Sequence, residues 1–268
     1  GYSTADARSA PELKSDKDQR PTTASFTPQY QTTQHNVGRM TLGISNQGWF
    51  GSWGGGARTD VFTGEEVKAC EFPKGSETRY LYAAGFWIGG IIGRDTLVST
   101  GIDGWSRSAH EFAPDEEPFG AITFRSLIDP EAPEYEDAVS EEDYVAVYTD
   151  TSTEGVDADF FRGPHIPLNI EVTEASYAWS YSYAEDIVLF DYKVKNIGTQ
   201  TLTNMFMGFY VDADIHFGQQ GVLSGAQDDL SGFLETYPAQ CFGCEYDDTV
   251  FIAWTMDNDG DFDSEDDP

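Results

Sequence analysis

The segment "DIVLFDYKVKNIGTQTLTNMFMGFYVDADI", residues 186–215, decides the fold of this chain. Its first half alternates apolar and polar residues, which is typical of a strand with one buried face. Asn196-Ile197-Gly198 then predicts a turn, and the apolar run 202–214 predicts a second long strand. Two long strands joined by a short turn pair antiparallel. On the first strand, one face would carry Val188, Phe190, Tyr192 and Val194, and the other Leu189, Asp191, Lys193 and Lys195.

Similar strand signals occupy much of the remaining chain, and no long stretch has the period of an amphipathic helix. Asn46-Gln47-Gly48 predicts a turn, and the chain reverses again either near Gly89-Gly90 or at Gly93-Arg94-Asp95. Many long strands need two layers to bury their apolar faces. The sequence therefore predicts an all-β fold, an antiparallel β-sandwich of jelly-roll or immunoglobulin-like type with long loops. The strand signals lie in residues 37–56, 78–101, 140–151, 166–182 and 248–257.

Changes in composition divide the chain into three parts. Residues 1–36 are polar and hold no hydrophobic period, which predicts an extended N-terminal arm. Residues 37–256 carry the strand signals and form the predicted sandwich domain. Within them, residues 106–143 are rich in acids and prolines, and we expect an inserted surface loop there. Residues 257–268 form an acidic C-terminal segment with the spacing of a calcium loop.

The charge balance is strongly acidic, with 47 acids against 15 bases and a net charge of −32. Such a surface repels nucleic acid and anionic membranes, so we expect no nucleic-acid partner. The acids cluster, because residues 111–143 hold twelve acids and one base, and residues 247–267 hold nine acids and no base. No apolar run approaches the roughly 18–20 residues that span a bilayer, so no membrane insertion is expected.

The first residues, "GYSTADARSA", have neither the basic start nor the apolar centre of a signal peptide. This leaves an intracellular protein or a processed, exported chain. The long aromatic strands and the acidic balance favour the exported chain. We therefore expect an extracellular or cell-surface location.

Three phrases resemble segments of large, uncharacterised exported bacterial proteins, many of which end in a type IX secretion sorting domain. They are the opening segment, "YLYAAGFWIGG" at 80–90 and "DTLVSTGIDGW" at 95–105. The resemblance covers residues 40–262, contains no catalytic motif, and implies an exported bacterial β-sandwich protein. The phrase "VKNIGTQTL" at 194–202 is also similar to extracellular immunoglobulin-like modules.

Acidic residues spaced by two follow two of the predicted strands. One such pair ends the strand of residues 202–214, and a longer run follows the last strand. Side chains two apart point the same way on an extended chain, and a D-x-D-x-D loop supplies several oxygens to one hard cation. The sequence thus predicts a calcium site, with an unliganded acidic tail as the alternative. The ligands would be Asp212, Asp214, Asp257, Asp259 and Asp261, with Asp228, Asp229 and Asp263 as additional ligands.

The C-terminal acidic run departs from the pattern of an EF-hand. Ser264 stands at the sixth position from Asp259, where that loop needs Gly, and no Glu stands at the twelfth position. The run also resembles the calcium loops of thrombospondin type 3 repeats and dockerins, which are shorter and need no flanking helix.

Aromatic residues between glycines form a second candidate site. The phrase "GWFGSWGGG" at 48–56 holds Trp49 and Trp53, whose rings would stack on sugars if they were exposed. Packing in the core at one end of the sandwich is the alternative. A further aromatic set alternates on one predicted strand face, where core packing explains it better than ligand stacking. This set is Tyr177, Trp179, Tyr181 and Tyr183.

The three cysteines, Cys70, Cys241 and Cys244, allow one disulfide and one free thiol, and all three are disulfide candidates. The "CFGCE" phrase has CxxC spacing but lacks the histidine of a haem-attachment motif and the βαβ setting of a redox motif. A zinc site would need two further ligands.

No catalytic motif stands out in the sequence. The histidines are far apart, and none lies in HExxH or beside a GxSxG elbow. They are His35, His110, His165 and His216.

The predicted function is a secreted or cell-surface structural protein that calcium stabilises. It would assemble into a homo-oligomer or filament through its N-terminal arm or its strand edges. The first alternative is a carbohydrate-binding module that holds a polysaccharide on Trp49 and Trp53. The second is a glycoside hydrolase that uses acids such as Asp212 and Asp214.

Overall fold

The computed structural model describes residues 29–51, 58–102, 110–115, 119–130, 137–153, 165–215, 229–238 and 249–257. Within these ranges the secondary structure consists of β-strands and contains no α-helix. No helix that is long and apolar enough to span a membrane occurs in them. The strands are β1 (Thr32–His35), β2 (Thr41–Ser45), β3 (Trp49–Phe50), β4 (Cys70–Glu71), β5 (Ala83–Ile92), β6 (Asp95–Thr100), β7 (Ala113–Pro114), β8 (Thr123–Arg125), β9 (Glu142–Thr149), β10 (Ile170–Ala178), β11 (Val188–Asn196), β12 (Leu202–Asp212), β13 (Leu230–Pro238) and β14 (Thr249–Met256).

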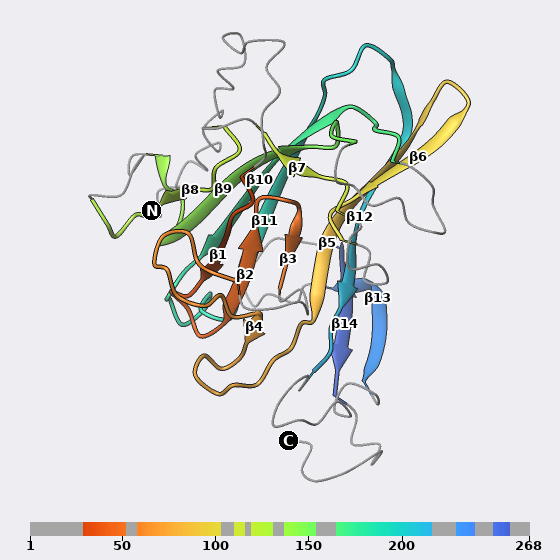
Figure 1. Cartoon of the computed structure of the whole chain (residues 1–268). Helices are drawn as coiled ribbons and strands as arrows, with labels where there is room; N and C mark the ends of the chain where they lie inside the picture. The colour runs from red at the N-terminus through yellow and green to blue at the C-terminus, as the bar shows by residue number, and fades with distance from the viewer. Residues whose placement is uncertain are drawn as a thin grey trace, which may run out of the picture.

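The strands form two main sheets and a separate hairpin (Figure 1). The first sheet has the order β1-β2-β3-β5-β12, with β4 beside β2 and β6 beside β5. The second has the order β11-β10-β9-β7, with β8 beside β9, and β13 pairs with β14 alone. All these strand pairs are antiparallel, and the sheets do not close into a barrel. The predicted all-β fold with antiparallel sheets is confirmed.

The core lies between the two main sheets, as expected for a sandwich. Its largest cluster joins Phe86 and Ile88 of β5 to Ile170 and Val172 of β10, with Tyr148 of β9. A second cluster places side chains of β2 and β5 against half-buried residues of β11. In Figure 1 the green and teal strands β9, β10 and β11 accordingly lie behind the orange strands β1, β2 and β3.

The first strand lies inside the segment that the sequence assigns to an unpaired arm. All four residues of β1 are buried, and the strand pairs with β2 from Thr32↔Ser45 to His35↔Leu42. Its side chains are polar, so no apolar alternation marks it. They are instead hydrogen-bonded: Thr33 Oγ1, for example, donates to Asp60 Oδ2 at 3.0 Å. The arm boundary at residue 36 is therefore wrong, and residues 1–28 lie outside the described part of the chain.

The acidic insertion at 106–143 is also more ordered than a surface loop. It contains β7 and β8, which both pair with β9. Phe112 and Ile122 from the same insertion are buried. The acidic, proline-rich composition therefore did not predict the two short strands β7 and β8, which single apolar residues anchor to the core.

Two further differences concern the second half of the chain. Strand β13 lies outside the stretches that carry strand signals in the sequence. The aromatic set beginning at Tyr177 does not share one strand face, because β10 ends at Ala178. Tyr181 and Tyr183 lie in the following turn, where their exposed rings stack 5.6 Å apart.

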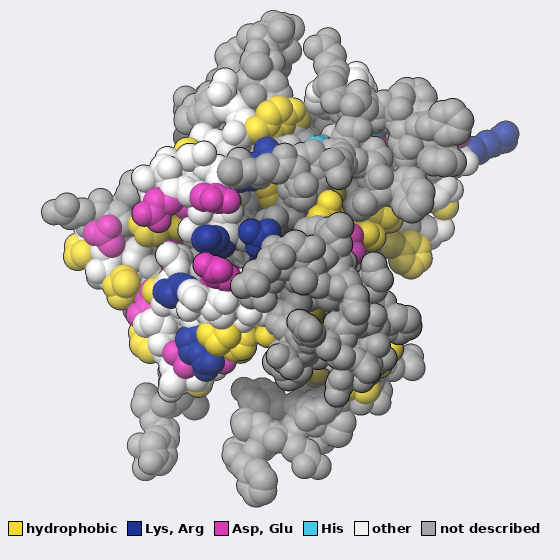
Figure 2. Space-filling view, turned by 60° about the horizontal axis from the view of Figure 1, so that its bottom comes forward, with side chains coloured by type: hydrophobic (Ala, Val, Ile, Leu, Met, Phe, Trp, Pro, Cys, Tyr) yellow, Lys and Arg dark blue, Asp and Glu magenta, His cyan; other side chains and the backbone are white. Residues whose placement is uncertain are grey.

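The described surface does not carry a uniform acidic coat. On the face shown in Figure 2, Asp and Glu side chains lie beside Lys and Arg side chains, with hydrophobic side chains between them. Mixed charge of this kind is ordinary for a soluble surface, so the net charge alone does not mark a binding face here.

Candidate functional site

The end of β12 carries the first pair of predicted metal ligands. Asp212 is the last residue of the strand and pairs with Ala83 of β5. The Tyr210 hydroxyl donates to Asp212 Oδ2 at 3.2 Å, since side chains two apart share a face. Asp214 follows two residues later and is half-buried.

The base of the β13–β14 hairpin adds a third carboxylate. Ile215 N–H donates to Asp229 Oδ2 at 3.0 Å, which ties the end of β12 to the residue before β13. Asp257 follows β14 at the same end of the hairpin, because Leu230 pairs with Met256. The strands that end at Asp212 and Met256 are thus not hydrogen-bonded neighbours in one sheet, but the ends of both elements hold acids.

These acids repel one another. Burial, followed by the charges of Asp212 and Asp229, raises the pKa of Asp214 to about 6. Within the described ranges, no three His, Cys, Asp or Glu side chains form a group that would hold a metal ion. The other predicted ligands, Asp228, Asp259, Asp261 and Asp263, lie outside the described residues.

Trp49 does not offer its ring to a ligand. The side chain is buried and packs with Ala83 and Ile102. On its other side the Arg58 guanidinium carbon lies 5.5 Å from the ring centroid. Trp49 is therefore a core residue, and its use as an exposed sugar platform is corrected. Trp53 lies outside the described residues.

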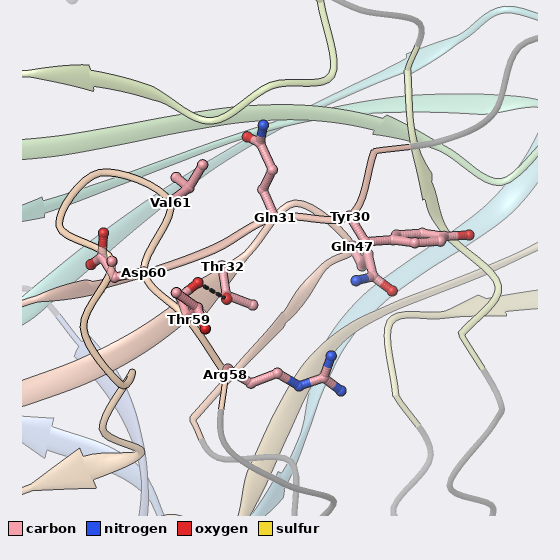
Figure 3. A pocket seen from close by; sticks show the side chains of 9 residues that line it. Tyr30, Gln31, Thr32, Gln47, Arg58, Thr59, Asp60 and Val61 are labelled. Carbon is pink, nitrogen blue, oxygen red and sulfur yellow. Dashed lines mark hydrogen bonds between the residues drawn. The ribbon is translucent and has the colours of Figure 1, made fainter.

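A polar pocket of about 580 Å³ opens beside Arg58. It lies over β1, the turn between β2 and β3, and the segment 58–64. Its side chains ring the hydrogen bond from Thr32 Oγ1 to the Thr59 carbonyl, which is 2.9 Å long (Figure 3). The lining residues are Tyr30, Gln31, Thr32, Gln47, Arg58, Thr59, Asp60, Val61 and Gly64.

The structure contains a Ser-His-Glu arrangement that no motif in the sequence indicates. His35 Nε2 lies 2.8 Å from Ser176 Oγ, and His35 Nδ1 lies 3.3 Å from Glu142 Oε2. The three residues come from β1, β10 and β9, so only the folded chain brings them together. Ser176 is 0% exposed, however, and a nucleophile must reach its substrate. The arrangement therefore fixes β1 against the second sheet, and Glu142 also accepts from the backbone of Asn36 at 2.7 Å.

A second buried histidine ties two loops to the core. His165 Nδ1 lies 3.2 Å from Glu111 Oε1, and His165 Nε2 lies 2.7 Å from the Asp150 carbonyl oxygen. Burial lowers the pKa of His165, but its bonds to Glu111 and Asp150 outweigh burial and raise it overall. Asp150 Oδ2 accepts from Ser99 Oγ at 2.7 Å. These groups contact one another in the interior and present no open reaction centre.

The structure tests the disulfide prediction for one of the three cysteines. Cys70 is a free thiol on β4, and burial raises its pKa to about 12. It is therefore no longer a disulfide candidate. Cys241 and Cys244 lie outside the described residues.

Known proteins give no guide to any of these sites: no family model, no curated protein and no solved structure matches the chain.

Proposed function

We propose that this chain is an extracellular or cell-surface structural protein that assembles with copies of itself through the edge formed by β11 and β12. Calcium at the end of β12 would stabilise it. The observation that carries the proposal is the apolar edge strand β12, which pairs with β5 on one side and with no described strand on the other. Turnover is not part of the proposal, because the one nucleophile–histidine pair in the described residues is buried.

Strand β12 is a long edge strand. In the part of the chain that the structure describes, it pairs only with β5. Phe206 is 77% exposed, Met207 64% and Phe209 50%. An exposed apolar edge is a template for pairing with another strand. The irregularity in the register of β12 lies between Thr203 and Phe206, so the strand is regular from Phe206 to Asp212.

The inner face of β12 is only partly covered by the second sheet. Met207 and Phe209 pair with the buried residues Ile88 and Phe86, so they face the space between the sheets. The ring of Phe209 reaches Tyr192 of β11 at 5.3 Å but remains half exposed. Because β11 pairs only with β10 in the described chain, a further strand beside β11 would cover this face.

A groove at this edge gives an incoming side chain somewhere to insert. It has a volume of about 560 Å³. Core residues Ile88 and Ile170 form part of its wall, together with Met205 and Met207. The groove is thus a place where the core reaches solvent.

A second copy of the chain is the partner that the charges favour. Copies with a net charge of −32 repel one another over most of their surface. Residues 202–211 contain no charged residue, so two β12 edges meet without that repulsion. An antiparallel pair of identical strands is also self-complementary about a two-fold axis.

Calcium supports the same edge in this proposal. Asp212 and Asp229 lie close enough to Asp214 for their charges to raise its pKa, and carboxylate oxygens are the ligands that calcium prefers. A bound cation would offset the mutual repulsion of these three residues and hold the β13–β14 hairpin near β12. The other predicted ligands, except Asp257, lie outside the described residues.

The association is tested by measuring oligomeric state by sedimentation over a range of concentrations. We expect wild type and Met207→Leu to associate, and Met207→Lys to remain monomeric, because lysine places a charge on the shared face. Tyr183→Lys, in an exposed turn away from β12, is the control and should associate like wild type. A wild-type chain that stays monomeric at the highest concentration would overturn the proposal, as would a Met207→Lys chain that still associates. Deletion of residues 1–28 separates the two routes of assembly. Association through the N-terminal arm would be lost in this variant, and association through the edge of β11 and β12 would remain.

A further inference from the structure

The polar pocket beside Arg58 contains the amide side chain of Gln47, from the turn between β2 and β3. Gln47 is 7% exposed, and its backbone N–H lies 3.2 Å from Ser45 Oγ. Its side-chain amide makes no hydrogen bond within the described part of the chain. Polar groups of a folded protein are nearly always hydrogen-bonded, so an amide without a protein partner normally faces water or a ligand. Gln47 lines the pocket together with Tyr30 and Arg58 (Figure 3).

The acceptors around this pocket are largely occupied. Asp60 Oδ1 accepts from Phe62 N–H at 2.8 Å and Thr63 N–H at 3.0 Å, and its Oδ2 accepts from Thr33. Gln31 Oε1 accepts from Ile122 N–H at 2.8 Å. Asp60 is therefore a structural group that holds the 60–64 turn, and the pocket does not present it as a free carboxylate.

The groups that face the pocket suit a hydroxyl-rich ring. Tyr30 is 58% exposed at the rim, where its ring offers a flat apolar surface. The amide of Gln47 offers donors and an acceptor, and Arg58 brings a guanidinium. Sugar rings combine an apolar face for stacking with hydroxyls that both donate and accept. The volume also lies in the range of about 300–1,000 Å³ typical of small-ligand sites.

We propose that this pocket binds one sugar ring of a polysaccharide. Tyr30 stacks on the ring, and the Gln47 amide hydrogen-bonds to its hydroxyls. The site differs from the tryptophan site that the sequence suggests, because Trp49 lies beneath Arg58 and is buried. It also lies on β1 and the β2–β3 turn rather than on β12, so it does not depend on self-association.

Binding is measured by calorimetric titration of the whole chain with neutral hexose oligosaccharides and with uronic-acid oligosaccharides. We expect at least one of these to bind, and we expect Gln47→Met and Tyr30→Ala each to weaken that binding by about tenfold or more. Tyr183→Ala removes an exposed tyrosine outside the pocket and should bind like wild type. Binding of the uronic-acid sugar alone, reduced by Arg58→Lys, would add recognition of the carboxylate by the guanidinium.

A thermal melt separates a ligand role for Gln47 from a structural one. Methionine nearly keeps the size of the side chain and removes an amide that makes no hydrogen bond within the described residues. The melting temperature of Gln47→Met should therefore equal or exceed that of wild type while sugar binding falls. Failure of every sugar in both sets to bind would overturn the proposal. So would binding that neither Gln47→Met nor Tyr30→Ala changes.

Discussion

The Tyr148 hydroxyl donates a 2.8 Å hydrogen bond to Glu174 Oε2, and both side chains are buried in the core between the sheets. Burial raises the pKa of Glu174 to about 8, although its hydrogen bonds to Tyr148 and Tyr192 act in the opposite direction. Glu174 is therefore protonated in the folded protein at neutral pH. The core holds a neutral carboxylic acid rather than a buried charge.

This proton predicts a loss of stability as pH rises. The pKa of Glu174 is raised on folding from an ordinary 4.5 to about 8, so the folded state binds more protons between these values. Its contribution to the free energy of unfolding is full below pH 4.5 and falls as pH rises toward 8. Glutamine mimics the protonated acid and does not titrate. From pH 5 to pH 8, the free energy of unfolding of Glu174→Gln should therefore rise relative to that of wild type by roughly 3 kcal/mol.

Urea unfolding at several pH values measures this difference. Glu185→Gln, near the surface, is the matched control and should follow wild type at each pH. Parallel stability curves for wild type and Glu174→Gln would contradict a protonated Glu174.

The acidic cluster predicts a stabilising effect of charge removal. Because the pKa of Asp214 is raised to about 6, its ionisation lowers stability as pH rises from about 4 to 6, and the whole cost is present at pH 7. Asp214→Asn should therefore melt at higher temperature than wild type in chelator at pH 7. The gain is roughly 1 kcal/mol after allowance for partial exposure of the carboxylate.

Calcium should reverse the order of the melting temperatures of wild type and Asp214→Asn. If calcium binds at Asp214, it raises the melting temperature of wild type more than that of Asp214→Asn. The check is a thermal melt of both proteins in calcium and in chelator, with magnesium as the control ion. A wild-type melting temperature that is equal in calcium and in chelator would remove the calcium site.

A close approach between two glycines predicts a large effect of one methyl group. A Cβ at Gly101 would lie 2.1 Å from the Gly48 carbonyl oxygen, and that carbonyl also accepts from Phe86 N–H at 2.8 Å. The backbone on both sides is fixed, so Gly101→Ala should destabilise the protein by roughly 2–3 kcal/mol. Gly208→Ala, whose Cβ meets nothing within 4 Å, should change stability little. Equal unfolding midpoints for these two variants would refute the contact.

The buried thiol predicts selective labelling. With its pKa raised to about 12 by burial, Cys70 is protonated and shielded, whereas the thiolate is the reactive form. Mass spectrometry of the native protein after alkylation should find Cys70 unmodified, and labelling should appear only on unfolding. Modification of Cys70 under native conditions would show that the strand opens.

The long strands could be predicted from sequence because their alternation is local. The stretch 186–215 predicted β11, the turn and β12, and the structure has strands at 188–196 and 202–212. The predicted pairing of these two strands with each other is wrong, because β11 pairs with β10 and β12 pairs with β5 in the other sheet. The turn at Gly93 is confirmed, with φ of 63° at that glycine. Strands β1, β7 and β8 were missed because polar side chains, prolines or acids occupy them, and tertiary hydrogen bonds stabilise such strands.

The candidate sites, like the strands, could be predicted only where the residues involved are close in sequence. Spacing by two correctly marked Asp212 and Asp214 as neighbours, and the contact with Asp229 appears only because Ile215 meets it in the fold. The polar pocket beside Arg58 had no sequence signal, because Tyr30, Gln47 and Arg58 come from three segments. Burial of Trp49 likewise follows from sheet packing, which aromatic spacing does not reveal.

The pairing of β5 with β12 also sets the order of events during folding. Ala83 pairs with Asp212, so the strands that meet are separated by more than a hundred residues of chain. On the ribosome, β5 emerges long before β12, and one of its edges waits without a partner. Pairings this distant in sequence close slowly, on timescales of about milliseconds to seconds. The nascent chain would thus expose an apolar strand during that interval, which makes synthesis its most aggregation-prone stage.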